Sequence, residues 1–239
     1  GAQVISGEYQ GKKVGALSDM TTFSFHPVKP VTTGEGGMVL TNNRELYEKL
    51  KLYHTHGITR EAQFMERHEL PENDGVWYYE QLELGYNYRI TDIQCALGIS
   101  QMRKLDQFAE HRRRLAARYD RLFAECTDII IPYQHPDCLS SYHLYMIQVP
   151  EQIRKAVFEN LRAAGVGVNV HYIPVYKLPY YQKHGYQDVC CPNAEEYYRR
   201  AITLPLYADM TEEQVDYVVE QTKLAVDHAK RLILHEGQN

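Results

Sequence analysis

Long hydrophobic runs are missing from this sequence. No apolar stretch approaches the roughly 20 residues that span a bilayer, and no signal peptide is visible at the start. Positive charge is not in excess either, because the formal net charge is −5. These absences predict a protein that has no membrane-spanning segment and whose main partner is neither a membrane nor nucleic acid.

Cysteine is scarce and irregularly placed. The five cysteines are an odd number, none has the spacing of a zinc motif, and Cys190 and Cys191 are adjacent. His54 and His56 lie close together but have no acidic or thiol neighbour in the sequence, so we expect no metal site. Reduced thiols without a disulfide framework are typical of the cytoplasm, which is the predicted compartment.

The composition is that of a globular protein, with 44% hydrophobic and 24% charged residues. Its 239 residues suffice for one large or two modest domains. Apolar spacing predicts a long amphipathic helix over 102–123, with the basic run Arg112 to Arg114 on its solvated face. From residue 128 on, expected strands at 129–132, 142–149 and 166–173 alternate with helices. We therefore predict an α/β chain with domains at 1–125 and 126–239.

A single lysine, Lys29, stands in an irregular segment between two short β-type runs, 22–25 and 37–41. Prolines and glycines fill that segment, which predicts a shaped loop rather than a helix. A lysine held in this way can form a Schiff base with a carbonyl cofactor, and hydroxyl donors such as Ser24, Thr32 and Thr33 can bind a phosphate. The alternative is a surface loop with a solvated lysine.

Two further segments carry candidate polar residues. Asn87 and Arg89 precede a helix whose start is marked by a Thr91–Gln94 capping-box pattern, and on their own they are typical of turn chemistry. His171 and Tyr172 lie toward the end of the expected strand 166–173. A histidine in that place is commonly a structural residue, so either role remains open.

The run S-F-H-P-V-K-P-V-T-T-G-E-G-G-M-V-L-T, from Ser24 to Thr41, strongly resembles the lysine segment of the DegT/DnrJ/EryC/StrS-type sugar aminotransferases. This resemblance implies an aspartate-aminotransferase-like enzyme of fold type I that depends on pyridoxal 5′-phosphate (PLP). It implies that Lys29 forms the covalent link to PLP and that Ser24 contacts the cofactor phosphate. It also implies a large-domain part at 1–125 and a small C-terminal domain at 126–239.

Two more motifs extend the resemblance over essentially the whole chain. The segment L-G-Y-N-Y-R resembles the family's interface segment, which implies a homodimer in which Asn87 reaches the partner's cofactor and Arg89 lies near the same site. The segment V-H-Y-I-P-V-Y resembles one that faces the nucleotide-sugar pocket, which implies that His171 and Tyr172 bind substrate.

The motifs are most similar to those of a subgroup that acts on the route to pseudaminic acid. Membership implies transfer of an amino group from L-glutamate to a UDP-linked 4-keto-6-deoxy-N-acetyl sugar. Another sugar, as in enzymes that make UDP-4-amino-arabinose, remains an alternative. The dehydratase branch of the family carries histidine in place of the lysine, and Lys29 argues against it.

The start of the chain gives a further expectation. Relatives in the family carry upstream residues that include an aspartate for the pyridine nitrogen of PLP, and here Gln3 stands where a following histidine is expected. The chain therefore resembles the C-terminal part of such an enzyme. An inactive fragment that folds but lacks part of the cofactor site is the alternative from a different functional class.

Overall fold

The computed structural model describes residues 3–67 and 74–236, with side chains up to residue 234. The chain divides into two compact units, Gly1–Leu105 and Asp106–Asn239. The second unit begins with a helix that ends at Phe123, so the predicted domain boundary after residue 125 lies at the end of this helix and not at its start. In the described residues, no helix combines the length and the apolar character needed to cross a bilayer.

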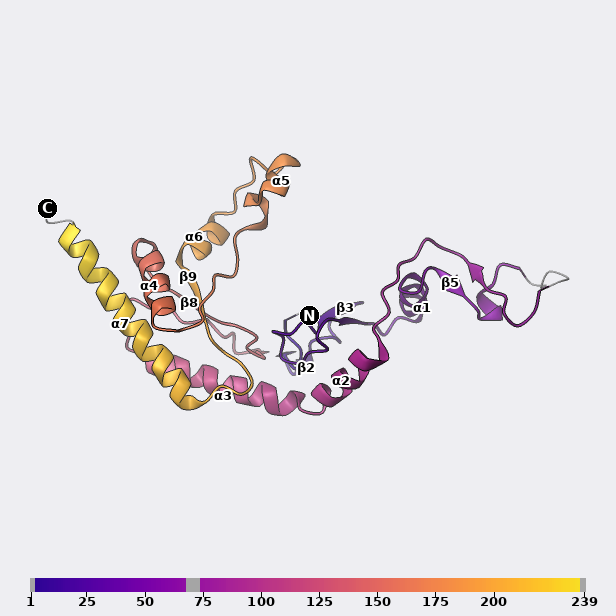
Figure 1. The fold of residues 1–239 in the computed structure, drawn as a ribbon, viewed down its shortest axis with the longest axis horizontal. Helices are drawn as coiled ribbons and strands as arrows, with labels where there is room; N and C mark the ends of the chain where they lie inside the picture. Colours follow the sequence, from indigo (N-terminus) through magenta and orange to yellow (C-terminus); the bar gives the residue numbers. More distant parts are fainter. Residues whose placement is uncertain (1–2, 68–73, 237–239) are drawn as a thin grey trace. The chain divides into compact units, whose positions relative to one another are not determined.

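Unit 1 is built from short elements that pair locally (Figure 1). Three antiparallel strand pairs, β1 with β2, β3 with β4 and β5 with β6, hold its loops. In chain order the elements are β1 (Glu8–Tyr9), β2 (Lys12–Lys13), β3 (Thr21–Ser24), β4 (Gly37–Leu40), α1 (Arg44–Tyr53), β5 (Ile58–Thr59), η1 (Ala62–Phe64), β6 (Glu80–Gln81) and α2 (Asp92–Met102).

Local sequence signals explain where the helices of unit 1 begin. Asn43 caps α1, since its side-chain Oδ1 accepts from the Leu46 N–H at 3.1 Å. The predicted capping box of α2 is confirmed, because Thr91 and Gln94 each bond the other's backbone N–H. Neither helix buries a side chain, so packing contributes little to holding them.

Unit 2 has a continuous core. Its elements are α3 (Leu105–Phe123), β7 (Cys138–Leu139), β8 (Tyr145–Gln148), α4 (Glu151–Ala163), η2 (Val175–Lys177), α5 (Pro179–Lys183), α6 (Pro192–Arg200), β9 (Ala201–Leu204) and α7 (Glu212–Glu236). Strands β8 and β9 pair antiparallel, and α7 runs alongside α4 (Figure 1). Alternate residues of β8 are buried, so that Tyr145 and Ile147 join the apolar faces of α3, α4 and α7 in one core.

The prediction that Arg112 lies on the solvated face of its helix is wrong. Its side chain is 4% exposed, and Nη1 donates to the carbonyl oxygens of Tyr142, His143 and Leu206 at 3.2, 3.4 and 2.8 Å. Burial lowers the pKa of the guanidinium. Arg112 therefore joins three chain segments by supplying donors to carbonyls that have none from the sheet.

The prediction of a full strand over 166–173 is also wrong. This stretch meets β9 at a single bridge, where Asn169 and Thr203 exchange backbone hydrogen bonds of 3.2 and 2.7 Å. Val166 and Val168 are nevertheless buried, so the alternating apolar pattern describes the packing correctly without the ladder. The chain then enters η2, which carries it away from the β8–β9 pair.

Candidate active site

The β3–β4 hairpin presents the loop that contains Lys29. Thr21 pairs with Leu40 and Ser24 with Gly37, so the two strands that the sequence predicts are present within one residue at each end. Beyond the strands, the Phe25 N–H donates to the Gly36 carbonyl at 2.9 Å, and the Thr33 N–H donates to the Phe25 carbonyl at 3.0 Å. The loop is therefore closed at its base by backbone bonds.

Lys29 lies within this closed loop. Its side chain is half-buried, and its backbone N–H donates to the His26 carbonyl at 2.9 Å. The His26 N–H in turn reaches Ser24 Oγ at 3.4 Å. The backbone of His26 thus connects Ser24 and Lys29, the two residues for which the resemblance implies cofactor roles. Pro27 and Pro30 restrict the backbone before and after Lys29.

The threonines of the loop hold its second half. Thr32 Oγ1 donates to the Phe25 carbonyl at 3.0 Å and accepts from the Gly34 N–H at 2.9 Å, while Thr33 Oγ1 donates to the Glu35 carbonyl at 2.7 Å. These hydroxyls are engaged in fixing the loop. The structure thereby gives Thr32 and Thr33 a role in shaping the loop, and leaves Ser24 at the strand end as the hydroxyl donor.

The start of α2 is tied to the same loop, which the sequence reasoning missed. Gln94 Nε2 donates to the Glu35 carbonyl at 2.9 Å, in addition to the part that Gln94 plays in its own capping box. Gly98 brings the helix close to the loop, because a Cβ at that position would lie 2.9 Å from Thr33 Cγ2. The capping-box pattern gave Gln94 a local role but no sign of this long-range contact.

Asn87 and Arg89 are exposed and belong to a segment that is fastened to the end of α1. Asn87 forms an isolated bridge with Thr55, and the Tyr88 N–H donates to the His54 carbonyl at 2.9 Å. The rings of Tyr86 and Tyr88 stack with centroids 4.7 Å apart. The segment is thus shaped by backbone pairing, with the side chains of Asn87 and Arg89 left at the surface of unit 1.

Two glycines permit this pairing. Gly57 has φ +69°, and a Cβ there would lie 1.9 Å from the Glu83 carbonyl oxygen. A Cβ on Gly85 would lie 2.1 Å from the Gly57 nitrogen. Backbone atoms are the obstacle in both cases. The two segments can therefore cross this closely only because neither position carries a side chain.

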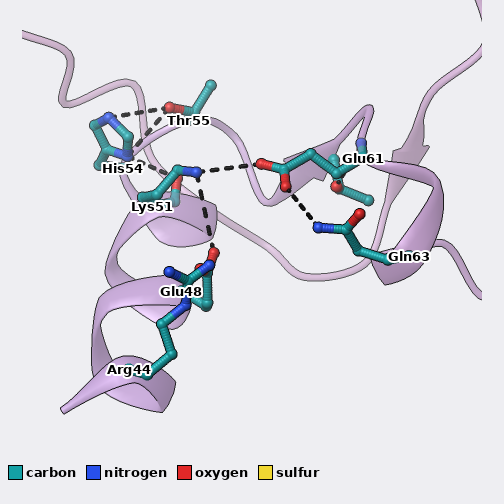
Figure 2. A network of polar contacts seen from close by, with 8 residues as sticks. Arg44, Glu48, Lys51, His54, Thr55, Glu61 and Gln63 are labelled. Carbon is teal, nitrogen blue, oxygen red and sulfur yellow. Dashed lines mark hydrogen bonds and ion pairs between the residues drawn. The ribbon is translucent and has the colours of Figure 1, made fainter.

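A polar network lies at the end of α1 (Figure 2). Lys51 lies between Glu61 and Glu48, with Nζ–O distances of 3.2 and 4.0 Å, and Glu61 raises the pKa of Lys51. The His54 ring bonds the Lys51 carbonyl through Nδ1 at 2.6 Å. Apolar side chains such as Leu52 and Phe64 line a cavity of about 400 Å³ beside this network. The network joins α1 to the chain that follows β5.

His171 and Tyr172 belong to unit 2. His171 Nδ1 lies 2.8 Å from Thr203 Oγ1 on β9, and the rings of His171 and Tyr172 meet edge to face with centroids 4.4 Å apart. Tyr172 is 60% exposed. The contact with Thr203 orients the imidazole, and Tyr172 presents its ring and hydroxyl at the surface of its own unit.

A cavity of about 740 Å³ in unit 1 lies on the hairpin and α2. Its walls are apolar and include Phe23, Phe25, Val31, Ile90 and Ile99, whereas Lys29, Ser24, Asn87 and Arg89 do not line it. Such a lining favours contact with another apolar surface over binding of a charged phosphate. The volume of this cavity would therefore not identify the candidate site residues, such as Lys29 and Ser24.

The donor set around the lysine fits PLP. Within the described part of the chain, Ser24 Oγ accepts only the long bond from His26, so its O–H is a donor that matches a phosphate oxygen. The half-buried amine of Lys29 matches the aldehyde carbon. Elsewhere in 3–67 and 74–236, no group of three histidine, cysteine, aspartate or glutamate side chains gathers to hold a metal ion.

Comparison with known proteins identifies the family. The model of the DegT/DnrJ/EryC1/StrS aminotransferase family matches residues 1–223. The UDP-4-amino-4,6-dideoxy-N-acetyl-beta-L-altrosamine transaminase of Campylobacter jejuni is 37% identical over 237 residues, which cover 96% of this chain and 58% of that protein. The chain thus spans somewhat more than half the length of the curated relatives it matches.

Solved structures give the same result. A putative sugar aminotransferase, Spr1654 from Streptococcus pneumoniae in its PMP-form, superposes with a TM-score of 0.86 at 30% identity, over 96% of this chain and 58% of that one. Helicobacter pylori PseC, an aminotransferase of pseudaminic acid biosynthesis, gives 0.84 at 32% identity, over 95% and 58%. The Streptococcus protein has also been solved in a PLP-form.

These matches confirm the predicted α/β fold of type I and the predicted cofactor of the family, PLP. They do not address individual residues, so the roles of Lys29, Ser24, Asn87, Arg89, His171 and Tyr172 stay predictions. The chain belongs to the DegT/DnrJ/EryC1/StrS aminotransferase family.

Proposed function

We propose that this chain takes part in PLP-dependent transfer of an amino group from L-glutamate to a UDP-linked 4-keto-6-deoxy-N-acetyl sugar, giving a UDP-4-amino sugar for pseudaminic acid synthesis. The relatives from Campylobacter and Helicobacter support the choice of sugar. The observation that carries the proposal is the closed loop that holds a half-buried Lys29 beside Ser24.

The proposed roles follow from the chemistry of each side chain. Bound PLP supplies an electron sink for the carbanion that forms when a proton leaves carbon. Lys29 Nζ holds the cofactor, and once released it takes the proton from Cα of L-glutamate. In the second half of the reaction, Lys29 Nζ delivers a proton to C4 of the sugar. Ser24 Oγ–H donates to the phosphate and so fixes the position of the reacting carbon relative to Lys29.

The remaining candidates act on the substrate or across a dimer. We propose that Asn87 donates to the cofactor phosphate held by a second copy of the chain, with Arg89 near the same site. Their exposure on a segment fixed by backbone pairing supports this role. We propose that His171 and Tyr172 contact the nucleotide sugar, since Thr203 orients the imidazole and Tyr172 is open to a ligand.

The cytoplasm is the proposed compartment. All five cysteines are free thiols, and two of them, Cys190 and Cys191, are adjacent and exposed. Thiols exposed in this way persist in a reducing compartment. A UDP-sugar and L-glutamate as substrates are compatible with the same location.

Absorbance spectroscopy tests the proposal. The chain is incubated with PLP, its spectrum is recorded, and borohydride is added to fix any imine. We expect an imine band that borohydride removes, a covalent adduct on Lys29 by mass spectrometry, and loss of both in Lys29→Ala. Lys183→Ala, an exposed lysine in α5, is the matched control and retains both signals.

Turnover gives the second measurement. Lys29→Ala lowers the rate of amino-sugar formation by at least about 1,000-fold, since it removes the proton-transfer group. An adduct at another lysine, or normal turnover by Lys29→Ala, contradicts the assignment. Paired assays with the 4-keto-6-deoxy-N-acetyl sugar and the 4-keto-arabinose nucleotide then decide which UDP-sugar is the substrate.

A further inference from the structure

Unit 2 contains a cavity that the proposed reaction does not use. It has a volume of about 590 Å³ and lies between the turn after α4, the loop after β9 and the first turns of α7. Gly165 and Gly167 form one side, Pro205 and Met210 the second, and Tyr217 stands on the third. All of its walls belong to a single compact unit.

Two tyrosines stand in the walls with their hydroxyl ends tied down. Tyr207 donates to Gln214 Oε1 at 3.1 Å, and Tyr217 donates to the Ala164 carbonyl at 2.9 Å. Their side chains are nevertheless 45% and 47% exposed. The rings are therefore held in place while a large part of their surface remains open to a ligand, an arrangement that suits a cation or an apolar body.

Three backbone donors of the cavity wall are already used. The Gly165 N–H donates to the Arg162 carbonyl at 3.1 Å, and the Val166 N–H donates to the Leu161 carbonyl at 2.9 Å. The Met210 N–H donates to the Tyr207 carbonyl at 3.3 Å. Together with the two phenol hydroxyls, five donors of the wall point to protein partners. A ligand that brings acceptors only, such as a carboxylate or phosphate, finds none of these five donors open.

Negative charge lies at the same place. Glu213 lines the cavity, and its own backbone N–H and the Thr211 hydroxyl lower the pKa of its carboxyl, which stays ionised at neutral pH. The neighbouring cation, Arg118, is paired with Asp216 at 2.6 Å and with Glu212. Glu213 is thus an acceptor beside two aromatic rings, next to a guanidinium that two other carboxylates already hold.

We propose that this cavity binds the primary ammonium group of a small organic ligand with an apolar body. The ammonium donates to the Glu213 carboxylate and lies against the tyrosine rings, and the body packs on Pro205 and on the exposed parts of the same rings. The inference does not depend on the proposed transamination, since none of these residues has a role in it.

The glycines of the wall allow a clean blocking variant. A Cβ on Gly167 meets no atom within 4 Å, and its φ lies outside the left-handed region, so a leucine there fills the cavity without backbone strain. Gly165 is unsuitable because its φ is +77°. Glu213→Gln removes the charge alone, and Glu220→Gln removes one charge from an exposed position of the same helix that does not line the cavity.

The test is a titration of the 239-residue chain with n-pentylammonium, followed by calorimetry and by NMR of the Gly165 and Gly167 amides. Pentan-1-ol and pentanoate, which share the apolar body, serve as neutral and anionic probes. We expect n-pentylammonium to bind with a Kd of about 1 mM and at least about tenfold more tightly than either of the other probes.

The variants separate the causes. Glu213→Gln is expected to weaken binding of n-pentylammonium by about tenfold, Gly167→Leu to abolish the shifts of the cavity amides, and Glu220→Gln to leave both unchanged. Thermal unfolding of each variant checks that the fold is intact. Equal affinity for the alcohol, tighter binding of pentanoate, or unchanged binding in either cavity variant overturns the proposal.

Discussion

The two units of this chain differ in how their apolar side chains are used. In unit 1, the buried apolar side chains of the described residues are Ile5, Phe23, Phe25, Pro30 and Val31, and both α1 and α2 bury none. In unit 2, one core joins α3, α4, α7 and the β8–β9 pair. Lys29, for which we propose the covalent link to PLP, belongs to the unit with less internal packing.

Unit 1 instead exposes apolar side chains in a pattern. Met38, Val39 and Leu40 of β4 and Ile93 and Ile99 of α2 are all exposed. Exposed apolar surface of this extent marks a contact region. The comparison teaches that unit 2 is held by its own core, whereas unit 1 is held by caps, hairpin bonds and glycine contacts, and each of these claims can be broken by substitution.

The largest difference is expected from one substitution made in both units. Leu161 on α4 is fully buried, so Leu161→Ala lowers the free energy of unfolding by about 2–5 kcal/mol through lost burial and a cavity. Leu97 on α2 is 43% exposed, and Leu97→Ala changes it by no more than about 0.5 kcal/mol. Urea unfolding followed by residue-resolved hydrogen exchange measures both; equal losses would refute the contrast.

A smaller effect is expected from substitution of Arg112, which tests whether polar contacts stabilise unit 2 in addition to its apolar core. Arg112→Met leaves the carbonyls of Tyr142, His143 and Leu206 without this donor and costs about 1–3 kcal/mol of unfolding free energy. Arg121→Met, on the exposed face of the same helix, is the control and stays near the parent protein. Chemical denaturation measures the free energy of unfolding of both variants. An unchanged value for Arg112→Met would contradict the proposed contribution of its hydrogen bonds.

The smallest effect concerns the tie between α2 and the lysine loop. Gln94→Ala removes a capping bond and the contact to Glu35, and costs about 1 kcal/mol. Because the same side chain holds the loop, hydrogen exchange at residues 32–36 speeds up and the yield of the borohydride-fixed PLP adduct falls. Gln101→Ala, at the other end of α2, changes neither. Faster exchange in unit 2 instead would contradict the local role.

Local signals in the sequence predicted the local structure. The hairpin around Lys29 and the Thr91–Gln94 box follow from patterns within a few residues, and the structure contains them. The wrong predictions concern residues whose environment is set by distant segments. The local sequence around Arg112 predicts a surface arginine. Only the fold brings the carbonyls of Tyr142 and Leu206 within hydrogen-bond distance of its guanidinium.

In the candidate site, too, local features could be predicted from the sequence, whereas long-range contacts could not. Proline, glycine and hydroxyl residues around Lys29 indicate a shaped loop, and the resemblance supplied its expected chemistry. The contact of Gln94 with Glu35 spans a separation along the chain that no periodicity encodes. The cavity beside Tyr207 and Tyr217 likewise needs three separate segments to meet.

The crossing of Gly57 and Gly85 has a consequence for how this protein tolerates mutation. Because each glycine is blocked by the other segment's backbone, no second-site change of a side chain restores the space that a Cβ would take. The two positions therefore have no route of compensation and are closed to stepwise drift. The side chains that follow Gly85, from Tyr86 to Arg89, are exposed, so the path of this segment is set by the glycine crossing and not by packing of those side chains.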